Sequence, residues 1–158
     1  MPEIIERSDQ PYLFIPAAVT MATIGPTIPQ LTGELFGWLG SHGIEPAGAP
    51  FVKYDVIDME RELLIEIGLP VETPAEGDDR VQAGTLPGGR YARLVHVGHP
   101  STLVDATGSL LAWAAQQGLA FDREDDRWAS RLEIYHSDPD VQPDLNKWET
   151  ELAFKLAD

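Results

Sequence analysis

Two glutamates near the C-terminus are the residues of this sequence best suited to chemistry. Glu133 lies in Arg131-Leu-Glu-Ile-Tyr135, and Glu151 lies in Glu-Thr-Glu-Leu-Ala-Phe-Lys. Both segments are typical of strands, in which alternate side chains share a face, so Glu133 is expected beside Tyr135 and Arg131. A carboxylate costs free energy to bury unless it is paired or hydrogen-bonded, so each glutamate is either solvent-facing or functional.

Two kinds of chemistry would suit this pair. If the carboxylates of Glu133 and Glu151 are buried close together, the proton affinity of one of them rises. The pair could then accept a ligand cation, or it could activate water while Tyr135 donates to a developing oxyanion. Glu149 and Lys155 leave a third possibility open, in which Glu151 is an exposed and paired residue.

Aromatic side chains could form the wall of a ligand site around these acids, because their faces attract cations and planar rings. Each could equally be a core residue. Trp38 and Trp113 are expected to pack between helix and sheet. The candidates for the wall are Tyr135, Trp128, Trp148, Tyr91, Phe14 and Tyr54.

Metal, nucleotide and serine hydrolase chemistry find little support in the sequence. Of the histidines only His96 and His99 are close, three residues apart and without a His-Glu-x-x-His pattern, so no metal site is expected. The chain has no cysteine for a disulfide or thiolate site. It also lacks a phosphate-cradling glycine loop and a Gly-x-Ser-x-Gly elbow, and no cofactor is expected.

The composition is that of one soluble globular domain spanning residues 1–158, with 43% hydrophobic residues. Its net charge of -15, from 26 acidic and 11 basic side chains, argues against direct nucleic acid contact, which needs clustered Lys and Arg. The N-terminus does not resemble a signal peptide, and no apolar run reaches membrane-spanning length. We therefore expect a cytoplasmic protein without membrane contact.

Helices and strands must position the two acids, and apolar spacing with turn residues predicts where they lie. Leu31, Leu35, Trp38 and Leu39 give one buried helix face, and Pro87-Gly88-Gly89 predicts a hairpin turn. The expected elements are a strand within 11–23, a helix from about 27 to 43, strands at 51–57 and 62–71, a link at 72–79, a hairpin formed by 81–86 and 90–97, a helix at about 101–117, an acidic loop at 122–126, and the two glutamate strands.

The two expected helices match each other. Residues 32–44 align without gaps on residues 107–119 at a constant offset of 75, and Glu66 in the first half corresponds to Glu151 in the second. This repeat predicts an α+β fold of two strand-helix-strand-strand units, at about 10–72 and 80–158, related by a pseudo-twofold axis. An antiparallel sheet would carry both helices, with a ligand cleft along the axis. When Tyr54 is aligned with Tyr135, Glu133 matches Val52 and has no internal counterpart.

A series of short motifs resembles the GyrI-like, or AraC-type effector-binding, domain family. They are Gly89-Arg-Tyr-Ala92, Leu111-Ala-Trp113, Leu132-Glu-Ile-Tyr135, Asp138-Pro139 and Thr150-Glu-Leu152, in this order, and the resemblance covers about residues 10 to 158. It implies two repeats around a central hydrophobic cleft that binds amphipathic, often cationic, small molecules. Members serve as ligand domains of transcription regulators or as stand-alone proteins, and a subset hydrolyses cyclopropane-containing cytotoxins.

The resemblance also implies roles for particular residues. The family's acidic ligand position falls on Glu133 with Tyr135 beside it, and a second acidic position falls on Glu151; Ala153 stands where some members have tyrosine, which suggests a roomier cleft. No helix-turn-helix segment precedes Pro11. The leading hypothesis is a stand-alone, multidrug-type protein for hydrophobic, aromatic or cationic molecules. The alternatives are a hydrolase of strained cyclopropane electrophiles using Glu133, Glu151 and Tyr135, and a modulator that binds an unknown DNA-handling protein.

Overall fold

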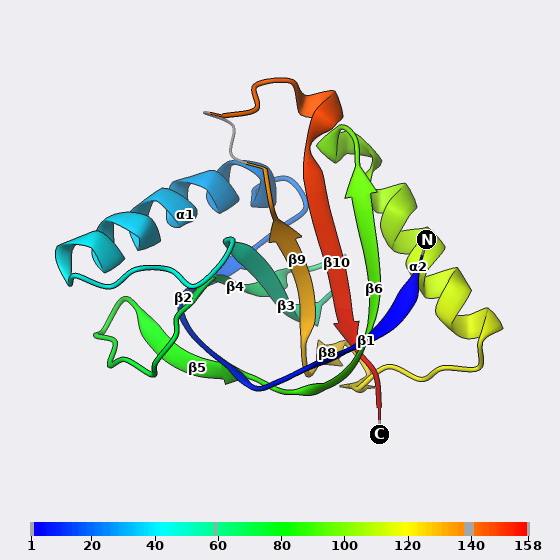
Figure 1. Cartoon of the computed structure of the whole chain (residues 1–158). Coiled ribbons are helices and arrows are strands. Elements are labelled where there is room, and N and C mark those ends of the chain that lie inside the picture. The colour runs from blue at the N-terminus through cyan, green and yellow to red at the C-terminus, as the bar shows by residue number, and fades with distance from the viewer. Residues whose placement is uncertain (1, 59, 138–140, 158) are drawn as a thin grey trace.

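The computed structural model describes residues 2–58, 60–137 and 141–157 as a curled sheet with two α-helices (Figure 1). Within these residues, no helix is long and apolar enough to cross a membrane. Two short 3-10 turns lie at Pro100–Thr102 and Leu145–Lys147. The main elements are β1 (Glu3–Arg7), β2 (Gln10–Val19), α1 (Ile24–Ser41), β3 (Phe51–Ile57), β4 (Leu63–Pro70), β5 (Gln82–Leu86), β6 (Gly89–Val97), α2 (Leu103–Gln116), β7 (Arg123–Glu124), β8 (Arg127–Trp128), β9 (Arg131–Tyr135) and β10 (Glu149–Lys155).

The strand order confirms the α+β fold of two repeats. The sheet runs β1-β6-β10-β9-β3-β4-β2-β5, and the described strand pairs are antiparallel. β3 and β9 pair at the centre, so β3, β4 and β2 on one side mirror β9, β10 and β6 on the other. Val52 pairs directly with Glu133, which is the match expected from the repeat. The pseudo-twofold axis therefore passes through this residue pair.

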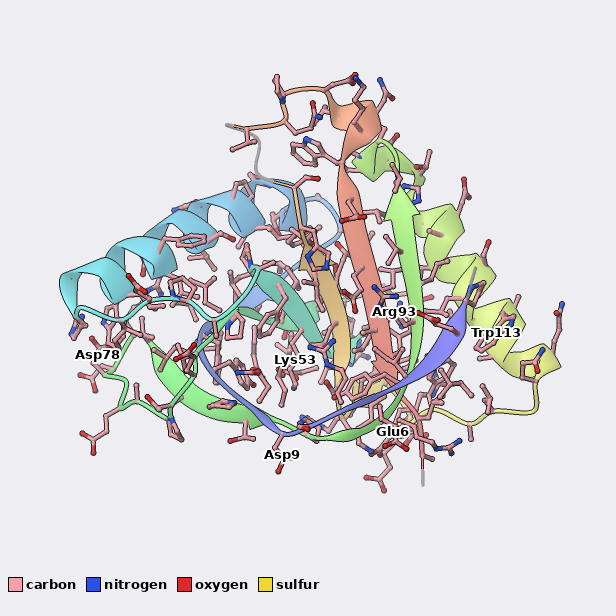
Figure 2. All side chains as sticks on the ribbon, viewed as in Figure 1. Glu6, Asp9, Lys53, Asp78, Arg93 and Trp113 are labelled. Atoms are coloured by element: carbon pink, nitrogen blue, oxygen red, sulfur yellow. The ribbon has the colours of Figure 1, made fainter. Side chains whose placement is uncertain are left out.

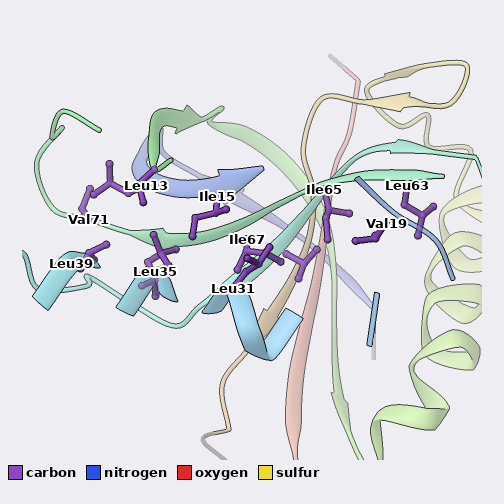
Figure 3. Packing of buried hydrophobic residues seen from close by; sticks show 13 residues of the cluster. Leu13, Ile15, Val19, Leu31, Leu35, Leu39, Leu63, Ile65, Ile67 and Val71 are labelled. Carbon is purple, nitrogen blue, oxygen red and sulfur yellow. The ribbon is translucent and has the colours of Figure 1, made fainter. Parts of the chain in front are cut away.

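Each helix covers one half of the same sheet face and leaves the central pair of strands between them. α1 packs on β2 and β4, and α2 packs on β6 and β10 (Figure 1). Figure 3 shows the first of these layers, where Leu35 lies against Ile15 and Ile67. Each helix is followed, two residues after its last residue, by a glycine with positive φ, Gly43 after α1 and Gly118 after α2, as expected at helix C-termini. The buried helix positions correspond at the offset of 75: Leu31, Leu35 and Leu39 in α1 match Ala106, Leu110 and Ala114 in α2.

The two outer strands of the sheet are exchanged between the repeats. β1 pairs with β6 of the second repeat, and β5 pairs with β2 of the first. The hairpin predicted around Pro87-Gly88-Gly89 is therefore wrong, because β5 is the last strand at one end of the sheet and β6 is the second strand from the other end. A glycine-rich turn indicates a change of direction, but the partner of each strand is decided by contacts far away in the sequence.

The glycines of this turn allow the β5–β6 connection to pass close to the β1–β2 connection. The Gly88 N–H donates to Asp9 Oδ1 at 2.6 Å, so the β5–β6 connection touches the β1–β2 connection, where Asp9 is labelled in Figure 2. A Cβ on Gly88 would lie 2.9 Å from the backbone oxygen of Arg7, and Gly89 has φ +137. The β1–β2 and β5–β6 connections each link strands near opposite ends of the sheet, and they meet at this contact.

Smaller differences from the sequence-based expectations are local. α1 begins at Ile24 rather than near Thr27, which places Pro29 inside the helix, where it cannot donate the backbone hydrogen bond of that position. The acidic loop at 122–126 contains part of a short β7–β8 hairpin, turned at Asp125 with φ 52, and Arg127 pairs with Val56 of β3. The Asp138-Pro139 motif lies outside the described residues.

Candidate functional site

Glu133 lies on the face of the sheet that carries the helices, between the areas that they cover. Its strand neighbours Val52 and Leu152 pack under α1 and α2 respectively. The Tyr135 hydroxyl donates to Glu133 Oε1 at 2.5 Å, and the Tyr54 hydroxyl lies 3.4 Å from Oε2, at the long end of hydrogen-bonding distance. All three side chains are half-buried. The carboxylate is thus held by two phenols in the centre of the molecule.

The two tyrosines come from equivalent positions of the two repeats. Because Val52 and Glu133 form the pair on the pseudo-axis, Tyr54 and Tyr135 each stand two residues beyond it in their own strands. Both point to the same carboxylate. The tyrosines follow the internal symmetry, whereas the residue between them breaks it.

Burial sets the protonation behaviour of this group. Loss of solvent raises the pKa of Glu133 above its ordinary value, and the hydrogen bonds from Tyr135 and Tyr54 and the positive charge of Arg131 offset part of that rise. Burial, together with the neighbouring carboxylate, holds the pKa of Tyr135 well above its ordinary value. The phenol therefore remains a hydrogen-bond donor at neutral pH, and the carboxyl has an increased tendency to bind a proton.

Arg131 links this cluster to a group of aromatic rings. Its guanidinium carbon lies 4.6 Å from the ring centres of Trp128 and Phe154 and 5.9 Å from that of Tyr54. Burial lowers the pKa of Arg131, and the Glu133 charge counteracts this effect. The sequence interpretation did not include Arg131 among the site residues, although its position two residues before Glu133 placed it on the same strand face.

Glu151 belongs to the opposite face of the sheet. Leu152, and not Glu151, pairs with Glu133, so the two glutamates point in opposite directions. The Glu151 carboxylate accepts from Arg93 Nε at 3.0 Å and lies 2.8 Å from His136 Nε2 and 3.6 Å from Arg7. Although burial alone would raise its pKa, the contacts with His136 and Arg93 lower it. The expectation that the two carboxylates share one site is therefore wrong.

Three of the expected wall residues also lie away from Glu133. Tyr91 is fully buried, and its hydroxyl donates to the Pro87 carbonyl at 2.6 Å and lies 2.9 Å from Ser130 Oγ. Phe14 stacks on Tyr12 in the apolar layer of the face that carries Glu151. The Trp148 indole donates to the Gln142 carbonyl at 2.8 Å, just before β10. Of the expected residues, the structure brings together Glu133, Tyr135 and Tyr54 directly, and Trp128 through Arg131.

A second polar cluster occupies the opposite face in the first repeat. Lys53 forms an ion pair with Asp55 and lies 3.5 Å from Glu66, whose other oxygen accepts from the Tyr12 hydroxyl. Burial, followed by the contact with Asp55, raises the pKa of Glu66 to about 7. A cavity of about 450 Å³ is lined by Asp55, Glu66 and Phe14 among others. Figure 2 labels Lys53 here and Arg93 in the other half.

The paired histidines form local hydrogen bonds. His96 Nε2 lies 2.8 Å from the Thr102 hydroxyl, and His99 Nδ1 accepts from the Ser101 N–H at 3.0 Å, where it caps the short turn before α2. The described residues contain no group of three or more His, Cys, Asp or Glu side chains arranged for a metal ion.

Comparison with protein families matches residues 1–157 to the GyrI-like small molecule binding domain. The chain belongs to the GyrI-like family. The motifs quoted above and the paired repeats agree with this assignment. No curated protein sequence matches the chain.

Solved structures with the same fold share little sequence with this GyrI-like chain. The EcmrR C-terminal domain aligns with a TM-score of 0.81 at 16% identity, and the alignment covers 99% of this chain and 97% of that domain. EcmrR in its DNA complex aligns with a TM-score of 0.81 at 17% identity, and the alignment covers 99% of this chain but only 57% of the EcmrR chain. A hydrolase from Listeria innocua aligns with a TM-score of 0.68 at 17% identity, and the alignment covers 99% of this chain and 91% of the hydrolase chain. SAV2435 bound to tetraphenylphosphonium aligns with a TM-score of 0.67 at 10% identity, and the alignment covers 99% of this chain and 94% of the SAV2435 chain.

Proposed function

We propose that this protein binds a hydrophobic, aromatic or cationic small molecule over the central strands, with Glu133 as its polar anchor. The observation that carries this proposal is the single carboxylate on the pseudo-axis, contacted by two equivalent tyrosines, at a position where the first repeat has Val52. The fold itself does not need an acid there, because a valine fills the matching position. A half-buried carboxylate at a position where the other repeat has valine is a candidate for ligand binding.

The carboxylate keeps capacity for a further partner. A carboxylate offers about four acceptor positions, and the two tyrosine hydroxyls fill two of them. A hydroxyl, amide or ammonium group of a ligand would take the others, while its apolar part contacts the half-buried rings of Tyr54 and Tyr135. The tetraphenylphosphonium complex of SAV2435 supports aromatic compounds as a ligand class by analogy of fold.

Titration calorimetry with tetraphenylphosphonium and with triphenylmethanol, an uncharged hydroxyl donor, tests the anchor. Glu133→Gln should weaken triphenylmethanol by about 1.5–3 kcal/mol, the range for hydrogen bonds to charged groups, and should weaken tetraphenylphosphonium because the attracting negative charge is lost. Glu151→Gln is the matched control, because it removes the same charge from the opposite face. Equal affinity of the wild-type protein and Glu133→Gln would discard the anchor.

A second candidate is hydrolysis of a strained cyclopropane electrophile at the same place. It is favoured by the raised pKa of Glu133 and by the phenol of Tyr135 at 2.5 Å, an acid-base group with an adjacent proton donor. Glu151 cannot join Glu133 on one substrate molecule, since it faces the other side of the sheet. Incubation with a cyclopropane-bearing alkylating agent separates the candidates: turnover lost in Glu133→Gln supports hydrolysis, and stoichiometric recovery of intact compound supports binding.

A further inference from the structure

Arg131 occupies the place among the aromatic rings where a ligand cation would be expected. Its guanidinium lies over Trp128 and Phe154 at 4.6 Å and near Tyr54 at 5.9 Å, all within the distance at which a ring face attracts a cation. Burial of the side chain strengthens this attraction, because less water competes for the charge. The site thus contains its own cation.

The same residue balances the charge of Glu133. The two side chains stand two residues apart on one face of β9, about 7 Å between their backbones. They form no ion pair with each other: the carboxylate is held by Tyr54 and Tyr135, and the guanidinium by the rings. The guanidinium therefore places a positive charge on the same strand face as the carboxyl group of Glu133.

The internal repeat indicates that Arg131 is not required by the fold. At the offset that matches Val52 with Glu133, the residue matching Arg131 is Pro50. The negatively charged Glu133 and the positively charged Arg131 therefore both belong to the second repeat, and neither has a charged counterpart in the first. A charge pair confined to the asymmetric part of a symmetric scaffold is suited to ligand selection.

We propose that Arg131 is a specificity-determining residue that makes the Glu133 site select uncharged hydrogen-bond donors over cations. This inference rests on the proposed function of the same site and narrows its ligand class. A neutral aromatic alcohol or phenol donates a hydrogen bond to Glu133, and the Arg131 guanidinium stays in place over the Trp128 and Phe154 rings. A cation at the same place must either stand beside the guanidinium or displace it. If the ligand cation stands about 7 Å from the guanidinium at an effective dielectric constant of about 20, their repulsion weakens its binding by about tenfold or more and so offsets the attraction that Glu133 exerts on it.

The test uses two isosteric compounds that differ in one atom and one charge, 4-tert-butylphenol and 4-hydroxyphenyltrimethylammonium. Dissociation constants come from NMR titration of the full chain, with the Trp128 indole signal as reporter. The wild-type protein should prefer the uncharged phenol, because the guanidinium offsets the attraction of Glu133 for the cation and the cation alone must give up the hydration of its charge. Arg131→Gln should bind the cation at least about tenfold more tightly than the wild-type protein, with the phenol changed by less than about threefold.

Two further variants separate charge from packing. Arg131→Lys keeps the positive charge but loses the flat guanidinium, so it should still bind the phenol more tightly than the cation, as the wild-type protein does. Arg123→Gln removes a cation that lies 5.0 Å from the Trp128 ring but is exposed, so it should leave the ratio nearly unchanged. If Arg131→Gln proves unstable in thermal unfolding, Arg131→Met provides the neutral variant, because its apolar stem still packs on the rings.

A wild-type preference for the cation would overturn this inference, and so would a parallel change of both affinities in the Arg131 variants. These results leave the proposed function intact, because Glu133 can anchor either compound. If neither compound binds the wild-type protein or Arg131→Gln, the proposed function fails and this inference with it. The two failures are therefore distinguishable.

Discussion

Glu66 and Glu151 occupy equivalent positions of the two repeats and have opposite electrostatic surroundings. Glu151 has two arginines and a histidine around its carboxylate. Glu66 shares Lys53 with Asp55, so two carboxylates meet one ammonium group. We predict that Glu66→Gln stabilises the protein at neutral and mildly alkaline pH, whereas Glu151→Gln destabilises it.

The size and the pH range follow from the pKa of Glu66, which rises from 4.5 to about 7 in the folded state. Between these values the folded protein binds more protons than the unfolded chain, so the free energy of unfolding falls as pH rises. At about 1.36 kcal/mol per pH unit, the ionised Glu66 costs up to about 3 kcal/mol above pH 7. Glu66→Gln keeps an oxygen for the Tyr12 hydroxyl and removes this cost, while below the ordinary pKa of glutamate the difference vanishes.

Urea unfolding of the wild-type protein and both variants, at steps between about pH 4 and pH 8, measures how the free energy of unfolding depends on pH. For Glu151 the sign is reversed: its folded pKa is lowered, so its stabilisation is present above the ordinary glutamate pKa and is lost as pH falls through the folded value. Glu151→Gln should therefore cost about 1.5–3 kcal/mol at neutral pH and less in acid. If the curves of Glu66→Gln and the wild-type protein run parallel from pH 5 to pH 8, the assignment of a buried excess charge to this cluster is refuted.

Three glycine substitutions test the packing of the scaffold in the same unfolding assay. Gly68→Ala should destabilise by about 1–3 kcal/mol, because its Cβ would lie 2.5 Å from the Phe51 ring; unchanged stability would mean that the ring moves aside freely. Gly88→Ala should destabilise by a similar amount, since its Cβ would meet backbone at the strand crossing, and a neutral result would speak against a tight crossing. Gly108→Ala should stabilise by about 0.5–1 kcal/mol, because it is helical with open space around it; a loss would reveal a contact that the fold does not show.

The sequence predicted the symmetric part of the fold well. Aligned helices at a constant offset correctly paired Leu35 with Leu110, both fully buried, and paired the capping glycines Gly43 and Gly118. Helix periodicity and caps are local signals, so they are readable without knowledge of the partners. The same alignment matched Val52 with Glu133, and the structure pairs these two residues.

Features that depend on pairing between distant segments could not be predicted. The exchange of β1 and β5 between the repeats depends on which strand meets which edge, and the turn at Gly88 carries no information about that choice. The relation of Glu133 to Glu151 depends on the register of β9 against β10. A shift of one residue moves every side chain of a strand to the other face, and no pattern in the two segments fixes that register.

The duplication within one chain explains why the central site holds a single acid. On a pseudo-twofold axis, equivalent side chains stand directly opposite each other, as Val52 and Glu133 do. Two glutamates there would place like charges in a cross-strand pair, which is destabilising. Tyrosines two residues away avoid this conflict, so both repeats keep them, as Tyr54 and Tyr135. A fused pair of repeats with independent sequences can present one carboxylate between two symmetric phenols, whereas an assembly of two identical repeats would carry either two acids or none.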